Sequence, residues 1–275
     1  GHNTNYHSMS NTRSTITVGA INLQNDVSTL QRSNEPFSTP GANILVSAPG
    51  ADILSTDFPE KGGTNDYTRA SGTSLSAPIV AGVVALILEA NPRLGFRDVQ
   101  AILALTARRD IVEDEKINFR TVWQTNASKA WNGGGMHISH DYGYGQVDAL
   151  AAVHLAENWM VSPQTEANVR RFAVPVISPT LNRAIPHGQT AGITESLSVE
   201  DNDIQIEHVE VRIRLKHGHD GDLIIKLISP SGTESILMDR PGKTNVSGTV
   251  VEKNNNNKEI THVFSTARLR GELGR

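Results

Sequence analysis

The hydrophobic positions of the first 160 residues predict two strands followed by three helices. Residues 15–18 and 44–47 are rich in β-branched and apolar side chains and run into small or turn residues, so each predicts a strand. Residues 79–90 are apolar on nearly every side, which predicts a buried helix rather than an amphipathic one. Two more helices are predicted at 96–109 and at about 145–159. This order favours an α/β sheet with packed helices.

The helix at 96–109 is predicted to be amphipathic. Its apolar side chains recur at helical spacing, while the other face carries charged residues, which are Arg97, Asp98, Arg108 and Arg109.

From about residue 171 the helical spacing disappears and short alternating segments replace it. Strands are predicted at 172–177, 196–199, 208–215, 223–228 and 235–237, separated by turn clusters. In 208–215 the apolar residues Val209, Val211 and Ile213 should face a core, with Arg212 and Arg214 facing water. The pattern predicts an all-β sandwich or jelly roll at 172–275, a first domain at 1–160 and a linker at 161–171.

The residues with the clearest chemical signal are 71–78, SGTSLSAP, which run directly into the apolar helix. The first N–H groups of a helix are unpaired and partly positive. A serine at this point can act as a nucleophile if a base removes its proton and if these N–H groups stabilise the oxyanion that results. Ser74 is the candidate, and Pro78 is expected in the first turn. The alternative is that Ser74 only caps the helix, which is the commoner role of a serine there.

These residues resemble the serine box of subtilisin-like serine proteases. With Glu89, Ala90 and Asn91 at the end of the helix, the sequence is most similar to the kexin and furin branch. Residues 140–149 resemble the end of the catalytic domain of that branch. Residues 217–223 and 228–233 resemble the P domain that follows it. The resemblance implies a partial subtilisin-like α/β core with a mostly parallel sheet, followed by a jelly-roll P domain, and a serine endopeptidase with Ser74 as nucleophile.

The rest of the catalytic machinery is not found upstream of Ser74. The family places its triad in the order Asp, His, Ser, and only His2 and His7 precede Ser74, neither of them in the histidine motif. The oxyanion asparagine is also expected upstream. We therefore expect a piece truncated at both ends, nearly inactive alone, whose partner is the N-terminal remainder of the catalytic domain.

Two other clusters could in principle carry chemistry. His137, His140 and Asp141 are expected to form structural hydrogen bonds rather than to complete a triad with Ser74. The second cluster contains His217, His219, Asp220 and Asp222. These side chains are of types that can bind a metal, but residues so close together in a turn more commonly hydrogen-bond to the backbone of their own loop. Structural calcium is implied by the family resemblance, with no ligands assigned.

Composition narrows the choice of partners. The formal net charge is only −4, which gives no sign of nucleic-acid binding. There are no cysteines, which excludes disulfides. No membrane span is predicted. The resemblance implies a secreted protein acting on proteins or peptides. A preference for paired basic residues is doubtful, because Thr39 stands at an expected acidic position and Glu35 would have to replace it.

Two alternatives to an active protease remain open. One is a non-catalytic binding or scaffold module in which the β domain is the functional part. The other is a degenerate protease that has lost its upstream residues.

Overall fold

The computed structural model describes residues 3–22, 37–58, 66–109, 123–128, 134–172, 183–186, 188, 192–198, 204–241 and 259–274. The helices and strands of the first part are η1 (Thr4–Tyr6), β1 (Thr17–Ile21), β2 (Ile44–Pro49), β3 (Ile53–Thr56), β4 (Tyr67–Ala70), α1 (Thr73–Ala90), α2 (Phe96–Thr106), β5 (Gln124–Thr125), β6 (His137–Ile138), α3 (Ala149–Glu157) and η2 (Glu166–Asn168). Those of the second part are β7 (Val209–Lys216), η3 (Asp220–Asp222), β8 (Ile224–Ile228), β9 (Glu234–Asp239) and β10 (Glu259–Thr266).

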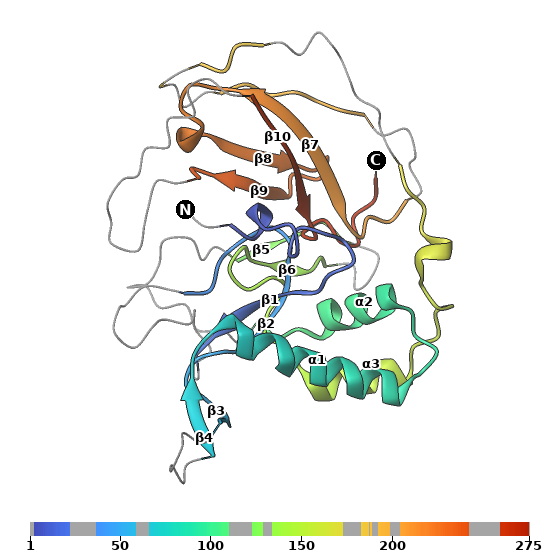
Figure 1. The fold of residues 1–275 in the computed structure, drawn as a ribbon. Coiled ribbons are helices and arrows are strands. Elements are labelled where there is room, and N and C mark those ends of the chain that lie inside the picture. The colour runs from blue at the N-terminus through green and yellow to red at the C-terminus, as the bar shows by residue number, and fades with distance from the viewer. Residues whose placement is uncertain are drawn as a thin grey trace.

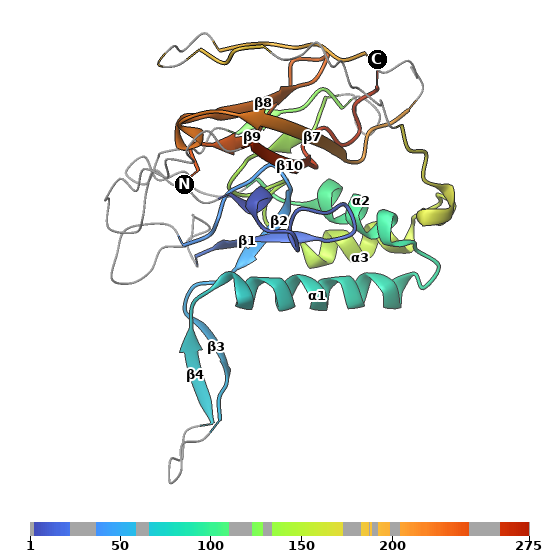
Figure 2. The same cartoon turned by 45° about the horizontal axis from the view of Figure 1, so that its top comes forward.

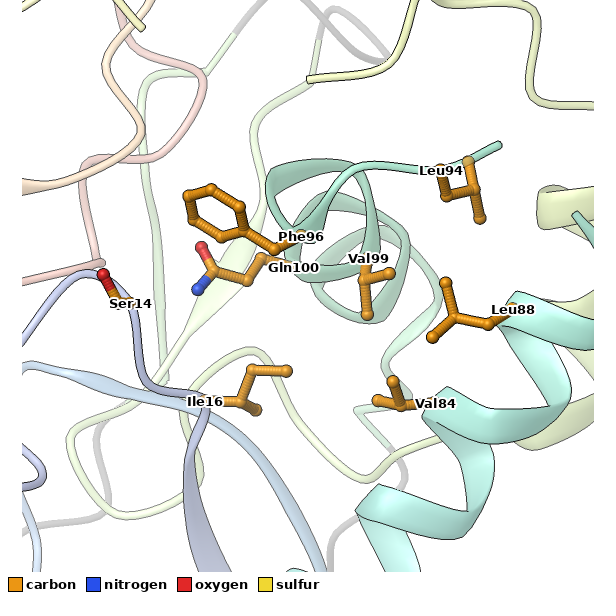
Figure 3. Close-up of a pocket in the computed structure, with 8 residues that line it drawn as sticks. All are labelled: Ser14, Ile16, Val84, Leu88, Leu94, Phe96, Val99 and Gln100. Atoms are coloured by element: carbon orange, nitrogen blue, oxygen red, sulfur yellow. The ribbon is translucent and has the colours of Figure 1, made fainter. Parts of the chain in front are cut away.

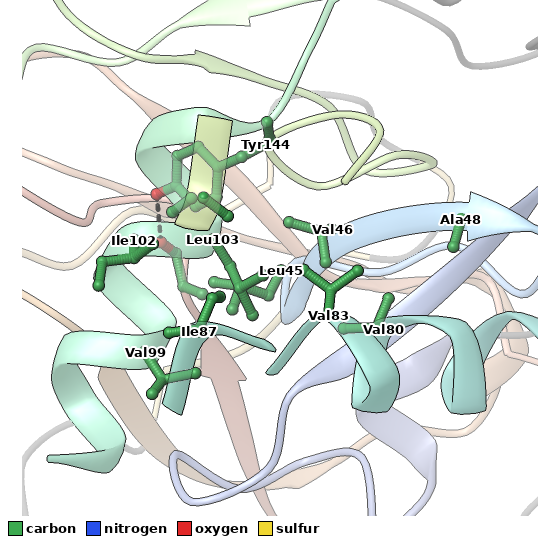
Figure 4. Close-up of a cluster of buried hydrophobic side chains, with 14 of the residues drawn as sticks. Leu45, Val46, Ala48, Val80, Val83, Ile87, Val99, Ile102, Leu103 and Tyr144 are labelled. Carbon is green, nitrogen blue, oxygen red and sulfur yellow. Dashed lines mark hydrogen bonds between the residues drawn. The ribbon is translucent and has the colours of Figure 1, made fainter. Parts of the chain in front are cut away.

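The first part packs its helices on a parallel pair of strands. β1 and β2 pair in parallel, and both contact α1. The core joins Val46 of β2 with Ile87 of α1 and with Ile102 and Leu103 of α2, all of them essentially without exposed surface (Figure 4). Figure 1 shows the three helices on one side of this strand pair and the strands of the second part on the other.

β3 and β4 form an antiparallel hairpin that the hydrophobic pattern does not predict. The hairpin stands away from the body and leads from β2 to the start of α1 (Figure 2). Its large side chains Leu54 and Tyr67 are each 59% exposed, so the alternation that usually indicates a half-buried strand is weak here.

The second part is built from two antiparallel pairs, β7 with β10 and β8 with β9, with β9 lying against β10. The predicted alternation in β7 is confirmed, because its apolar residues are half-buried and its charged residues are exposed. β10 was not predicted. Of the predicted strands at 172–177 and 196–199, residues 173–177 and 199 lie outside the described residues, and the described remainder forms no strand.

The prediction that the helix after Ser74 is buried on all sides was wrong. One face of α1 is buried, through Ser76, Val80, Val83 and Ile87, whereas Ala81 and Ala85 are exposed and Leu86 is 47% exposed. β1, β2 and α3 pack against the buried face, and the other face lies at the outside of the described part of the chain (Figure 2). By length and composition α1 could cross a membrane, a test that the core helices of soluble proteins also pass.

The polar face predicted for α2 is also partly wrong, because Arg97 and Asp98 are buried. The guanidinium of Arg97 donates to both carboxylate oxygens of Glu207, at 2.6 Å each. Asp98 accepts the N–H groups of Gly95 and Gln164, at 2.8 and 2.7 Å. These partners satisfy the two charges, which is the condition for burying them.

Candidate active site

Ser74 occupies the second position of α1 and its side chain is exposed. The residue that caps the helix is Gly72, in an extended conformation and with no side-chain hydrogen bond to the helix. Ser74 therefore does not act as the cap. Its position leaves the hydroxyl free to face solvent at the positive end of a helix of 18 residues.

The backbone around Ser74 carries unpaired groups. The N–H of Ser74 is among the first four of the helix, which have no partner within it, whereas the next N–H, from Leu75, donates to the carbonyl of Gly72 at 3.0 Å. Pro78 was expected in the first turn, but it is the sixth residue of α1. Because proline has no N–H, the helix cannot pair the carbonyl of Ser74 at this point.

The end of β2 and the tight turn after it hold the serine turn, residues 71–74, in place. The N–H of Gly72 donates to the carbonyl of Gly50 at 2.7 Å, and the hydroxyl of Ser76 donates to the carbonyl of Pro49 at 3.2 Å. A Cβ added to Gly50 would lie only 2.3 Å from the Ser76 hydroxyl oxygen and 2.8 Å from the Cβ of Ala20. Only glycine therefore lets the two segments approach so closely.

The histidines of the first part are engaged elsewhere. Nε2 of His140 accepts the N–H of Ile236 in β9, at 2.8 Å. The ring of His137 packs edge-on against Trp123, with 5.5 Å between centroids. Burial lowers the pKa of His137, and the positive charge of Arg109 adds to this effect. Among the described residues no histidine is seen hydrogen-bonded to Ser74, and His2 lies outside them.

The cluster around residues 217–222 satisfies its own loop. Nδ1 of His217 receives the N–H of His219 at 3.1 Å, and the N–H of Gly221 donates to the carboxylate of Asp220 at 3.0 Å. Within the described ranges no group of three histidine or acidic side chains is arranged to hold a metal ion.

A small apolar pocket lies at the far end of α1. Its volume is about 270 Å³, and Val84 and Leu88 of α1 face Phe96 and Val99 of α2 and Ile16 across it (Figure 3). Val84 is ten residues beyond Ser74, or about 15 Å along a helix axis. This pocket is therefore not the place where a substrate would meet Ser74.

The arrangement, an exposed serine at the start of an apolar helix on parallel strands with a β-sheet region behind it, is that of a subtilisin-like serine protease. Residues 1–145 match the subtilase family, and residues 206–274 match the proprotein convertase P-domain. The chain belongs to the subtilase family, and it carries the P-domain that marks the kexin and furin branch.

Its relatives include furin of Rattus norvegicus, 37% identical over 187 residues, which cover 68% of this chain and 21% of that protein. Proprotein convertase subtilisin/kexin type 6 of Homo sapiens is 38% identical over 191 residues, covering 68% of this chain and 17% of that protein. The chain thus spans about a fifth of the length of these curated relatives. The crystal structure of a serine protease of Aeromonas sobria shares the fold, with a TM-score of 0.63 at 22% identity, covering 94% of this chain and 48% of that one.

Proposed function

We propose that this chain belongs to a serine endopeptidase whose nucleophile is Ser74. The observation that carries the proposal is the exposed Ser74 hydroxyl at the second position of α1, in a position where it does not cap the helix. Membership of the subtilase family and the match to the P-domain support peptide-bond hydrolysis as the reaction.

In the proposed mechanism the Ser74 oxygen attacks the carbonyl carbon of the scissile bond, and a histidine takes the hydroxyl proton. The N–H of Ser74, together with an asparagine supplied from elsewhere, stabilises the oxyanion. The C–N bond then breaks, the histidine returns its proton to the leaving amine, and an acyl-enzyme forms. Water attacks this ester, gives its proton to the histidine, and releases the acid while Ser74 regains its hydrogen.

The histidine and the aspartate of the triad are proposed to come from a segment outside these 275 residues, the N-terminal remainder of the catalytic domain. The open apolar face of α1, where Leu86 is 47% exposed, supports a partner surface of this kind. Without the base, the 275 residues alone are expected to be nearly inactive.

The finer organisation is also part of the proposal. Residues 1–160 would form the catalytic portion, 161–171 the linker and 172–275 an incomplete P domain of jelly-roll type, with β1 and β2 belonging to a mostly parallel sheet. The antiparallel pairs β7–β10 and β8–β9 support the β-sandwich interpretation.

Structural calcium, a secreted location and protein or peptide substrates are proposed from membership of the family. Calcium prefers clusters of oxygen ligands, and the described residues offer no acidic cluster that fits it, so no step of the mechanism involves it. A secreted protein acting on protein or peptide substrates is proposed. Thr39 is half-buried, and Glu35 lies outside the described residues.

The test is labelling of the full-length gene product with a fluorophosphonate, in which the serine oxygen displaces fluoride from phosphorus. The wild-type protein should be labelled, and Ser74→Ala should abolish labelling. Ser162→Ala, which changes an exposed serine in the proposed linker, should leave labelling intact.

Labelling, partner binding and the sequence of the full-length gene together separate the alternatives. A wild-type protein that is not labelled, with partner binding unchanged in Ser74→Ala, would favour a non-catalytic module. A full-length gene that encodes no triad histidine upstream would identify a degenerate protease.

A further inference from the structure

The turn that aims Ser74 is held from the side by a second segment, the corner at residues 50–52. The backbone N–H of Asp52 donates to the hydroxyl oxygen of Ser71 at 2.9 Å. Together with the hydrogen bond between Gly72 and Gly50, this contact attaches both residues that precede Thr73 to the corner. Ile53 and Ala70 pair in the hairpin directly beside it, so the corner and the serine turn continue the β3–β4 ladder.

Asp52 adopts an uncommon backbone conformation to make this contact. Its φ is 55°, in the left-handed region that residues other than glycine rarely adopt, although Asp and Asn tolerate this region better than most residues. Such conformations persist where surrounding contacts hold them, and they are concentrated at functional sites.

Arg69 supplies the contacts that hold Asp52. Its Nη1 donates to the backbone carbonyl of Asp52 and to its carboxylate, both at 3.0 Å. The pair is well exposed, with side-chain exposures of 59% for Arg69 and 39% for Asp52. Exposed ion pairs contribute little to overall stability, so this one is poorly explained as a device for holding the fold together.

We propose that Asp52 is a positioning residue for the reaction of Ser74. Held by Arg69, Asp52 directs its N–H to Ser71, and this fixes the turn from which the Ser74 hydroxyl projects. Ser74 itself is exposed and has no side-chain hydrogen bond to another described residue, so its direction depends on that turn. This role rests on the proposed function, because it concerns the same nucleophile.

The test compares variants of the full-length protein by their rate of inactivation with the fluorophosphonate, separated into the maximal rate kinact and the half-saturating concentration KI. Asp52→Ala removes the carboxylate and disfavours the left-handed backbone, so kinact should fall about tenfold with KI unchanged, because small displacements of a reacting group have large effects on rate. Asp52→Asn tolerates the backbone and can still accept from Arg69, so it should stay within about twofold of wild type. Ser71→Ala, which removes the acceptor, should lower kinact about three- to tenfold.

Lys226→Ala is the matched control. It removes an ion pair with Glu234 that has the same 3.0 Å length and similar exposure on β8 and β9. It should leave kinact unchanged. Combining Asp52→Ala with Ser71→Ala should cost little more than either change alone, because both act through one hydrogen bond.

Two results would overturn the role of Asp52. One is wild-type kinact in both Asp52→Ala and Ser71→Ala while labelling still requires Ser74. The other is a loss of kinact that follows a loss of melting temperature and that Asp52→Asn does not rescue. Ser71→Ala keeps the test decisive if Asp52→Ala does not fold. Labelling that survives in Ser74→Ala would instead overturn the proposed function itself.

Discussion

At the scale of residues, two serines two positions apart in α1 have opposite environments. Ser74 is exposed, whereas Ser76 has no exposed surface and donates to Pro49. Two residues correspond to about 200° of rotation around a helix, so one of the two must point away from the core when the other points into it. Which one faces solvent is decided by the strand pair against which α1 packs.

Tyr144 illustrates how much a single buried polar group can contribute. Its hydroxyl donates to the carbonyl of Ala267 at 2.6 Å, and burial raises its pKa. Tyr144→Phe should therefore lower the free energy of unfolding by about 1–2 kcal/mol, because the carbonyl loses its partner in a buried place. Denaturant unfolding of the 275-residue chain measures this. Tyr67→Phe, at a residue that is 59% exposed, should have no effect, and an equal loss in both variants would contradict the argument.

At the scale of elements, α1 combines an apolar sequence with a half-open environment. Its buried face packs on β1, β2 and α3, and its other face carries exposed apolar residues such as Ala81, Ala85 and Leu86. A contiguous exposed apolar face is typical of a surface that binds a partner. The same helix also carries Ser74 at its start, so whatever covers the open face would lie close to the proposed nucleophile.

Neighbouring residues of α1 allow a direct test of this half-open packing. Ile87→Ala, at a site with no exposed surface, should cost about 2–5 kcal/mol of unfolding free energy in the 275-residue chain. Leu86→Ala removes a side chain of similar size that is 47% exposed, and it should cost less than about 1 kcal/mol. Equal costs, measured by denaturant unfolding, would show that the outer face of α1 is covered.

At the scale of the whole molecule, the two parts share buried contacts. Ala267 of the second part lies in the core of the first, and Ala42 of the first lies in the core of the second. Polar bonds connect them as well, including those of Arg97 with Glu207 and of Arg270 with Gln100. The predicted boundary in the sequence is therefore not a gap in space, and the two parts should unfold together.

His208 lies at this interface and should make the stability of the chain depend on pH. Burial, with the positive charges of Arg270 and Arg13 close to it, lowers the pKa of His208 from 6.5 to about 3. Between these values the unfolded chain binds a proton that the folded chain does not, so the free energy of unfolding should fall as the pH decreases. The pKa of His137 is lowered too, which acts in the same direction.

The measurement is denaturant unfolding at pH 7 and pH 5. The wild-type chain should lose stability between these conditions, with one such histidine contributing at most about 1.4 kcal/mol per pH unit. His208→Gln should lose less. His154→Gln, on the exposed surface of α3, should behave like the wild type, and a His208→Gln variant with an unchanged pH dependence would contradict this origin.

The sequence by itself determined the features that depend on near neighbours. The helices α1, α2 and α3, the alternation of β7 and the motif around Ser74 follow from periodicities of two to four residues and from a short motif, which act within one element. The weakly alternating hairpin β3–β4 gave no such signal. Neither did the conformation of Asp52, which depends on Arg69 across that hairpin.

Only the tertiary structure decided which polar groups are buried and which apolar ones are exposed. Arg97 is separated from Glu207 by 110 residues, and Tyr144 from Ala267 by 123. Burying a charge is favourable only when a partner meets it, and that partner comes from a distant segment that no local pattern identifies. For the same reason, the uniformly apolar sequence of α1 could not show that one of its faces lies open beside Ser74.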